Sequence, residues 1–115
     1  MPTDWSENIM VAELLDEPAL SEELGSLIQR AEGGGEAMPH VVLNFAGVSY
    51  VNSSNLGQML KLRTAVGSRG RQLRVCSVGP DVWSVLQVTG LDKLFSFAPD
   101  PLTALASLQL ADAGS

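Results

Sequence analysis

The sequence predicts a single α/β domain with a mostly parallel or mixed central sheet of four to five strands and about four helices. The first observation is that apolar periodicity switches repeatedly between the pattern of a strand and that of a helix along the chain. The second is that the connections between these segments are short, as in domains whose helices cover a parallel sheet. The third is size, because 115 residues, 45% of them hydrophobic, suffice for one core and not for two.

Residues 8–32 are expected to form the first strand and the first helix. An apolar run over residues 8–15 predicts the strand. Asp16 and Pro18 mark the start of the helix, because Asp accepts hydrogen bonds from free N–H groups and Pro fits the first turn. The apolar face of this helix consists of Leu20, Leu24, Leu27, Ile28 and Ala31. The glycines and prolines of residues 33–39 predict a flexible linker, since a phosphate-binding loop would also carry Lys followed by Ser or Thr.

The core that carries the functional motif is expected in residues 40–108, which begin with a strand at His40–Phe45. This strand is nearly all apolar and is therefore predicted to be central, with both faces covered. A helix follows and ends near Gly67 and Gly70. Its apolar residues are Leu56, Met59, Leu60 and Val66. The turn before this helix is therefore a place where a central strand leads directly into a helix.

The next strand and helix are predicted at residues 72–78 and 80–89. Alternating side chains indicate the strand, and Gly79-Pro80-Asp81 and Gly90 mark the two ends of the helix. The inward positions of the helix are expected to be Val82, Val85, Leu86 and Thr89. Trp83 is expected to pack against the core rather than to contact a partner.

The last two elements are predicted to be a short strand at residues 93–97 and a helix that starts at Asp100-Pro101. The apolar residues of that helix recur every three positions, at Leu102, Leu105 and Leu108. Small and polar residues follow, so residues 109–115 are expected to form a loose tail.

Composition and charge exclude several classes of function. The net charge is −6 and the pI about 4.5, so no positively charged footprint for nucleic acid is expected. No apolar run approaches the ~20 residues of a membrane span, and the first residues lack the basic and apolar segments of an export signal. A cytoplasmic protein is therefore expected, with its single Cys76 as a small core residue.

The sequence gives no support for catalysis or for a cofactor. The single His40 and the single Cys76 are far apart and belong to no cluster of metal ligands, so neither a metal nor another cofactor is expected. Nucleophilic catalysis by Ser53 or Ser54 would need a nearby base, and His40 is predicted at the opposite end of its strand. The glycine motif of a dinucleotide site is also missing. The protein is therefore not expected to be an enzyme.

Charge is unevenly distributed along the chain. Nine of the thirteen acidic residues precede Ala37, whereas five of the seven basic residues lie between Lys61 and Arg74. Cations near the C-terminus of a helix are favoured by the helix dipole, so a solvated helix end is the simpler explanation of the basic stretch. The alternative is a docking surface for an acidic protein.

The turn at Tyr50–Gly57 is more polar than capping alone requires. Asn52, Ser53 and Ser54 are all residue types that cap helices, and one of them is sufficient for that purpose. A phosphate on a serine at this position would meet exposed N–H groups and the positive end of the helix dipole. It would turn a neutral docking face into a strongly negative one and so prevent a partner from binding.

Two segments resemble STAS domains of the anti-sigma-factor antagonist type. In that family an apolar strand and the pattern hydrophobic-Asp-Ser-Ser/Thr-Gly-Leu-Gly lead into a helix, and Val41–Leu60 reads VVLNFAGVSYVNSSNLGQML. Gly79–Phe95, GPDVWSVLQVTGLDKLF, is similar to the family's later helix, which leads to the last strand. The resemblance extends from about Val41 to Leu108.

The resemblance implies a regulatory, non-catalytic role. Antagonists of this type bind an anti-sigma factor that is also a serine kinase. The kinase phosphorylates the serine that follows the Asp of the motif, and a phosphatase removes the phosphate. That serine corresponds to Ser53. The partner-binding residues implied by the motif are Asn52, Ser53, Ser54, Asn55, Leu56 and Gly57. The sequence does not fix the oligomeric state, and a homodimer is compatible with it.

Two residues of the motif depart from the family pattern, since Asn52 replaces Asp and Asn55 replaces Gly. The N-terminal third also lacks the family's Gly-Glu-Leu-Asp, for which Asp16 and Glu17 are the available substitutes. These departures leave two other functions open. One is a non-phosphorylated STAS scaffold or accessory module in a signalling or lipid-transport complex. The other is a small-molecule or nucleotide binder that uses the same turn as an anion site.

Overall fold

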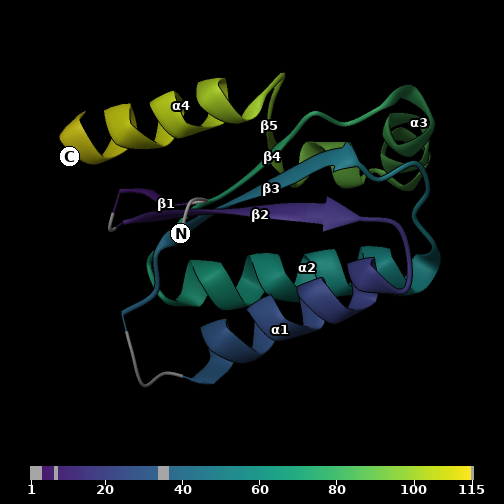
Figure 1. Cartoon of the computed structure of the whole chain (residues 1–115), viewed down its shortest axis with the longest axis horizontal. Coiled ribbons are helices and arrows are strands. Elements are labelled where there is room, and N and C mark those ends of the chain that lie inside the picture. The colour runs from purple at the N-terminus through teal and green to yellow at the C-terminus, as the bar shows by residue number, and fades with distance from the viewer. Residues whose placement is uncertain (1–3, 7, 34–36, 115) are drawn as a thin grey trace.

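The structure is a computed structural model that describes residues 4–6, 8–33 and 37–114 (Figure 1). Its centre is one five-stranded sheet with the strands side by side in chain order. The strands are β1 (Asp4–Ser6), β2 (Ile9–Leu15), β3 (His40–Gly47), β4 (Leu73–Cys76) and β5 (Ser96–Ala98). β1 runs antiparallel to β2, and the other neighbouring pairs are parallel. The predicted mixed sheet of four to five strands is therefore confirmed.

Four α-helices cover this sheet. They are α1 (Ala19–Gly33), α2 (Ser53–Ser68), α3 (Pro80–Thr89) and α4 (Pro101–Gly114). Figure 1 shows α1 and α2 side by side below the sheet and α4 above it. α3 lies at the end of the sheet toward which the arrows of β2 and β3 point. The result is a three-layer arrangement with β3 in the middle of the sheet, as its apolar sequence predicts.

Two hydrophobic clusters form because successive residues of a strand point to opposite faces. The larger cluster lies between the sheet and α1, α2 and α3; it includes Leu14, Leu43, Phe45, Leu24, Met59, Leu62 and Leu86. The smaller cluster joins the sheet to α4; it consists of Ile9, Val11, Val42, Cys76, Ala104, Leu105 and Leu108, with Ala98 packed against it. Every apolar position predicted for α1 is buried, which confirms that face of the helix.

Cys76 and Trp83 are in the environments that the sequence predicts. Cys76 is a free thiol in the core, and burial raises its pKa. The Trp83 ring is partly buried and meets the Phe97 ring edge to face, with ring centroids 5.0 Å apart. Such a contact favours packing as the role of Trp83.

The end of the chain differs from the prediction at several positions. Gly90, with φ of 81°, ends α3 and leads into a 3-10 turn at Leu91–Lys93, so the last strand is Ser96–Ala98 and not residues 93–97. Thr89 is exposed, and its hydroxyl donates to the carbonyl of Val85 at 2.9 Å. Leu102 is also exposed, and α4 continues to Gly114, through the segment that was expected to be loose. A strict spacing of three residues drifts around a helix of 3.6 residues per turn, which explains why Ala104 is buried instead of Leu102.

Other boundaries also shift by a few residues. β4 is shorter than predicted, because Ser77 has a positive φ of 60° and ends the extended conformation. On α2, Leu62 is fully buried, whereas Leu56 and Leu60 are only partly so. Of the predicted linker at residues 33–39, residues 34–36 lie outside the described part of the chain.

The start of α1 is capped by a different residue than predicted. Asp16 accepts hydrogen bonds from the backbone N–H and the hydroxyl of Ser49, so its carboxylate holds the loop after β3 and not the helix. The carboxylate of Glu17 accepts from the N–H of Ser21 at 2.9 Å and takes the capping role. A carboxylate one position further along the chain thus does the work that the sequence assigned to Asp16.

Candidate functional site

The candidate site is the N-terminus of α2, which begins at Ser53 directly after the N-cap Asn52. Figure 1 places this end of α2 beside the start of α1, at the edge of the sheet where β2 and β3 end. Both Ser53 and Ser54 are exposed, and their hydroxyls form no hydrogen bond within the described part of the chain. The geometry expected of Ser53, a hydroxyl at a helix start on the rim of the sheet, is therefore present.

Asn52 and Asn55 form a reciprocal capping box. The side-chain oxygen of Asn52 accepts from the N–H of Asn55 at 2.8 Å, and the side-chain oxygen of Asn55 accepts from the N–H of Asn52 at 3.0 Å. This arrangement satisfies two of the N–H groups that a helix start leaves without intrahelical partners. The N–H groups of Ser53 and Ser54 are left at the exposed end of the helix. The two asparagine side chains therefore cap the helix, and the two serine hydroxyls are not needed for capping.

Asn55 also connects α2 to the start of α1. Its side chain is completely buried, and its amide nitrogen donates to the Glu17 carboxylate at 2.8 Å and to the Ser21 hydroxyl at 3.3 Å. The amide nitrogen of Gln58 donates to the carbonyl of Ser21 at 3.1 Å. A buried amide with several partners fixes the relative position of the elements that it joins. The turn that carries Ser53 is therefore held against α1.

Of the six residues that the motif implied for partner binding, the structure brings five to or near the surface. Ser53, Ser54 and Gly57 are exposed, and Asn52 and Leu56 are half-buried. Asn55 is the exception, because its side chain is buried and offers no surface to a partner. The role of Asn55 is to hold the turn in place through its hydrogen bonds to Glu17 and Ser21.

The sequence did not single out the apolar side chains near this turn. Tyr50 is 63% exposed in the loop before α2, and Leu15 is 59% exposed at the end of β2. The Asp16–Ser49 hydrogen bonds tie the chain after β2 to the loop after β3 and so bring these segments together. Exposed large apolar side chains beside polar groups are typical of interaction surfaces. The signal in the sequence was the position of Leu15 at the end of one strand and of Tyr50 just beyond the end of another.

The position of His40 relative to this turn is the one that the sequence predicts. His40 is buried at the first residue of β3, whereas Ser53 follows the end of that strand, so the expected separation is confirmed. Within residues 4–6, 8–33 and 37–114, no group of three His, Cys, Asp or Glu side chains is placed to hold a metal ion. Over the same residues, no helix is both long and apolar enough to cross a membrane.

Two carboxylates beside the turn are held in their charged forms. The pKa of Glu17 is lowered, first by the hydrogen bond from the Ser21 hydroxyl and next by the one from the Asn55 amide. The pKa of Asp16 is lowered mainly by the hydrogen bond from the Ser49 N–H. Hydrogen bonds to a carboxylate favour its ionised form, which explains both directions. The edge near Ser53 therefore already carries negative charge.

Acidification is expected to destabilise the protein through Glu17. Because the pKa of Glu17 is lower in the folded chain than its ordinary value of 4.5, its contribution to stability is present above that value and is lost as the pH falls through the folded pKa. Urea denaturation between pH 6 and about 3 measures this loss. Glu17→Gln should flatten the decline, whereas Glu23→Gln, at an exposed position in α1, should not. Equal slopes for the two variants would contradict the role of Glu17.

The fold and the site together define a small α/β domain that presents exposed hydroxyls at a capped helix start. The model of the STAS domain family matches residues 11–104. The chain belongs to the STAS domain family, and the resemblance seen in its sequence is confirmed.

Individual proteins resemble this chain as well. The anti-sigma F factor antagonist of Paenibacillus polymyxa is 30% identical over 71 residues, which are 62% of this chain and 61% of that protein. A STAS domain protein of the anti-sigma-factor antagonist type from Planctomyces limnophilus has a similar structure, with a TM-score of 0.74 and 19% identity over 88% of this chain and 91% of that one. The phosphorylated form of the Bacillus cell fate determinant SpoIIAA has a TM-score of 0.66 and 19% identity, over 90% of this chain and 94% of that one. The structural neighbours establish the fold.

Proposed function

We propose that this protein is an anti-sigma-factor antagonist that acts by partner switching. In its unphosphorylated form it binds an anti-sigma factor that is also a serine kinase, and phosphorylation of Ser53 ends the binding until a phosphatase restores the hydroxyl. The observation that carries the proposal is the Ser53 hydroxyl, exposed at the first residue of α2. The homology to an anti-sigma F factor antagonist supports the same role, as does a structural neighbour that was captured in a phosphorylated form.

A phosphate on Ser53 would change the surface without unfolding it. It would carry about −1.5 to −2 charges at neutral pH, next to the uncapped N–H groups at the start of α2. The carboxylates of Asp16 and Glu17 already make this edge negative, and each keeps its own hydrogen-bond partners. Any partner that covers Tyr50 and Ser53 in the neutral state would have to bury the added charge, which is strongly unfavourable.

The two unusual asparagines support a working phosphorylation site rather than a lost one. An Asp at position 52 would cap α2 through its carboxylate, and Asn52 does the same through its side-chain oxygen. Asn55 adds the second half of the capping box. The change from Asp to Asn therefore removes a charge beside the serine but keeps the helix start, and with it the position of the hydroxyl.

A second function remains a candidate because of the same missing charge. A STAS module that is never phosphorylated would bind its partner through this edge permanently, as a scaffold in a signalling or lipid-transport complex. The two functions differ in one property. The complex of a scaffold is indifferent to kinase and phosphatase treatment, whereas a partner switch forms its complex in the unphosphorylated state alone.

Intact-mass spectrometry after incubation with the kinase of the native cell and ATP is the first test. We expect the wild-type protein to gain one phosphate and Ser53→Ala to gain none. Ser54→Ala, which removes the neighbouring exposed hydroxyl, is the matched control and should still be modified. If Ser53→Ala gains a phosphate and Ser54→Ala does not, the acceptor is Ser54 and the assignment to Ser53 is wrong. If no variant gains a phosphate, the scaffold function is favoured.

A further inference from the structure

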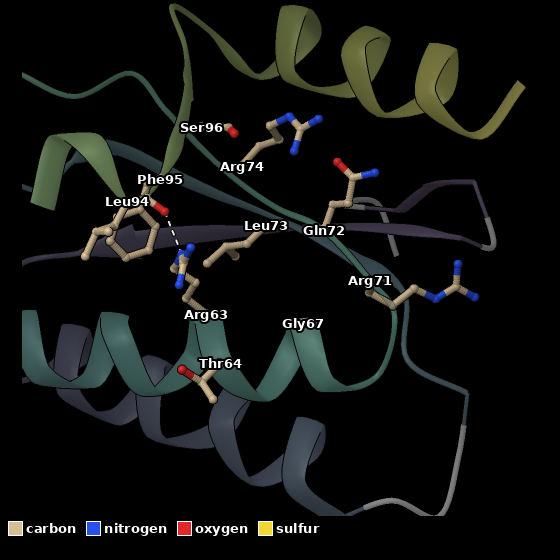
Figure 2. A pocket seen from close by; sticks show the side chains of 10 residues that line it. All are labelled: Arg63, Thr64, Gly67, Arg71, Gln72, Leu73, Arg74, Leu94, Phe95 and Ser96. Atoms are coloured by element: carbon tan, nitrogen blue, oxygen red, sulfur yellow. Dashed lines mark hydrogen bonds between the residues drawn. The ribbon is translucent and has the colours of Figure 1, made fainter. Parts of the chain in front are cut away.

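A second feature of the surface lies on the other half of α2 from Ser53. It is an opening of about 440 Å³ between the C-terminal half of α2, the start of β4 and the segment before β5. Its lining includes the apolar residues Leu73, Leu94 and Phe95 and three arginines, Arg63, Arg71 and Arg74, all labelled in Figure 2. β5 pairs with β4 only from Arg74 onward, so Leu73 at the start of β4 has no partner on β5.

The opening is strongly positive within a chain whose net charge is −6. No Asp or Glu is among the ten residues that line it, and no carboxylate of the described residues forms an ion pair with any of the three arginines. Arg63 donates through Nε to the carbonyl of Leu94, and Arg74 donates through Nε to the Ser107 hydroxyl at 3.2 Å. These bonds hold each guanidinium by one edge and leave the terminal nitrogens available.

The imidazole ring of His40, which lies next to Arg71, does not neutralise the positive charge of Arg71. Its guanidinium lies 3.5 Å from Nε2 of His40. Nδ1 of the same ring accepts a hydrogen bond from the N–H of Gln72 at 2.9 Å, so in the neutral ring the proton is on Nε2. Nε2 is then a donor and does not accept from Arg71. The positive charge of Arg71 is therefore not compensated there.

The arrangement of the arginines indicates the shape of a ligand. In Figure 2 the guanidinium of Arg63 lies near Leu94, that of Arg74 points toward α4, and that of Arg71 points outward past the start of β4. They do not converge on one point, as they would around a single phosphate ion. An elongated ligand with several separated anionic groups fits three such donors, and an apolar group of that ligand fits against Leu94 and Phe95.

We propose that this opening docks an extended acidic segment of a partner protein, with carboxylates opposite Arg63, Arg71 and Arg74 and an apolar side chain against Leu94 and Phe95. Guanidinium groups bind carboxylates in pairs of parallel hydrogen bonds, so each acidic residue can be recognised separately. The opening lies where β5 does not pair with the start of β4, and an extended chain can approach there. This docking does not depend on Ser53, which lies at the other end of α2.

Fluorescence anisotropy with two labelled octapeptides tests the proposal. One has the sequence Asp-Glu-Asp-Leu-Phe-Glu-Asp-Glu, and the other has every acid replaced by its amide. We expect saturable binding of the acidic peptide alone, with the affinity reduced at least about tenfold in the double variant Arg63→Gln/Arg74→Gln. The matched control is Arg30→Gln/Lys61→Gln, which removes the same charge from exposed positions outside the opening and should change the affinity less than about twofold.

Thermal unfolding followed by circular dichroism establishes that each double variant is folded before it is compared. Equal losses of affinity in the two double variants, or equal binding of the acidic and amide peptides, would overturn the proposal. Binding of inorganic pyrophosphate that Arg63→Gln/Arg74→Gln abolishes, without binding of the acidic peptide, would assign the opening to a phosphate ligand instead. Dimerisation in analytical ultracentrifugation that the same variant abolishes would assign it to a second copy of this chain.

Discussion

Ser53→Asp is expected to weaken binding to the partner by about 3 kcal/mol, roughly a hundredfold in affinity. The side chain at this position is exposed at the rim of the sheet, next to Tyr50 and to the carboxylates of Asp16 and Glu17. A partner that covers the Asp side chain must bury its negative charge. Among the described residues around the turn, no cationic side chain is available to pair with it. The helix N-terminus stabilises the added carboxylate in the free protein, so the variant should fold normally while its complex is weakened.

Isothermal titration with the partner captured from native cells measures this effect. Ser53→Ala should bind like the wild type, because it keeps the neutral surface, and Ser54→Asp serves as the control for one added charge at the adjacent exposed position. A weaker effect is expected for Ser54→Asp than for Ser53→Asp if residue 53 lies at the centre of the contact. Equal affinities of Ser53→Asp and Ser53→Ala would mean that charge at this turn does not control binding.

Asn55→Ala is expected to lower the free energy of unfolding by about 2–3 kcal/mol. The substitution removes the acceptor for the Asn52 N–H and the donor to Glu17 and Ser21, and it leaves a small cavity at a completely buried position. Because the Asn55 side chain is completely buried, its removal costs packing in addition to these hydrogen bonds. The expected loss therefore exceeds that of an ordinary helix cap.

Urea denaturation of the single and double variants separates the parts of this effect. Asn52→Ala removes the N-cap alone and is expected to cost about 1 kcal/mol. The double variant Asn52→Ala/Asn55→Ala should cost less than the sum, because the two side chains act as one capping box. Strict additivity of the two losses would contradict the capping box, and a loss below about 0.5 kcal/mol for Asn55→Ala would contradict the role of its amide in holding the turn against α1.

Most of the fold could be predicted from local patterns. The apolar face of α1 and the nearly continuous apolar run of β3 each depend on a single period, and both patterns were correct. The predicted bounds and buried positions were wrong where a single residue departs from the pattern around it. The left-handed conformation of Gly90 directs the chain into the 3-10 turn Leu91–Lys93, so the last strand begins later than predicted. Leu102 lies outside the buried face of α4, although its spacing from Leu105 matches that of Leu108.

The site could be located but not fully interpreted from the sequence. A strand that leads into Asn-Ser-Ser predicted a helix start with exposed hydroxyls, and Ser53 is there. The roles of the two asparagines could not be predicted, because Asn55 meets Glu17 and Ser21 only after α1 and α2 pack together. The exchange of roles between Asp16 and Glu17 has the same origin, since Ser49 reaches Asp16 across 33 positions of the chain.

Whether a phosphate on Ser53 ends partner binding is tested by isothermal titration of the partner with the protein that carries phosphoserine at position 53. The unmodified protein and the protein with phosphoserine at position 54 are measured beside it. We expect tight binding of the unmodified protein and no measurable binding once residue 53 carries the phosphate. Unchanged affinity of the form phosphorylated at position 53 would contradict this expectation, as would an equal loss from a phosphate at position 54.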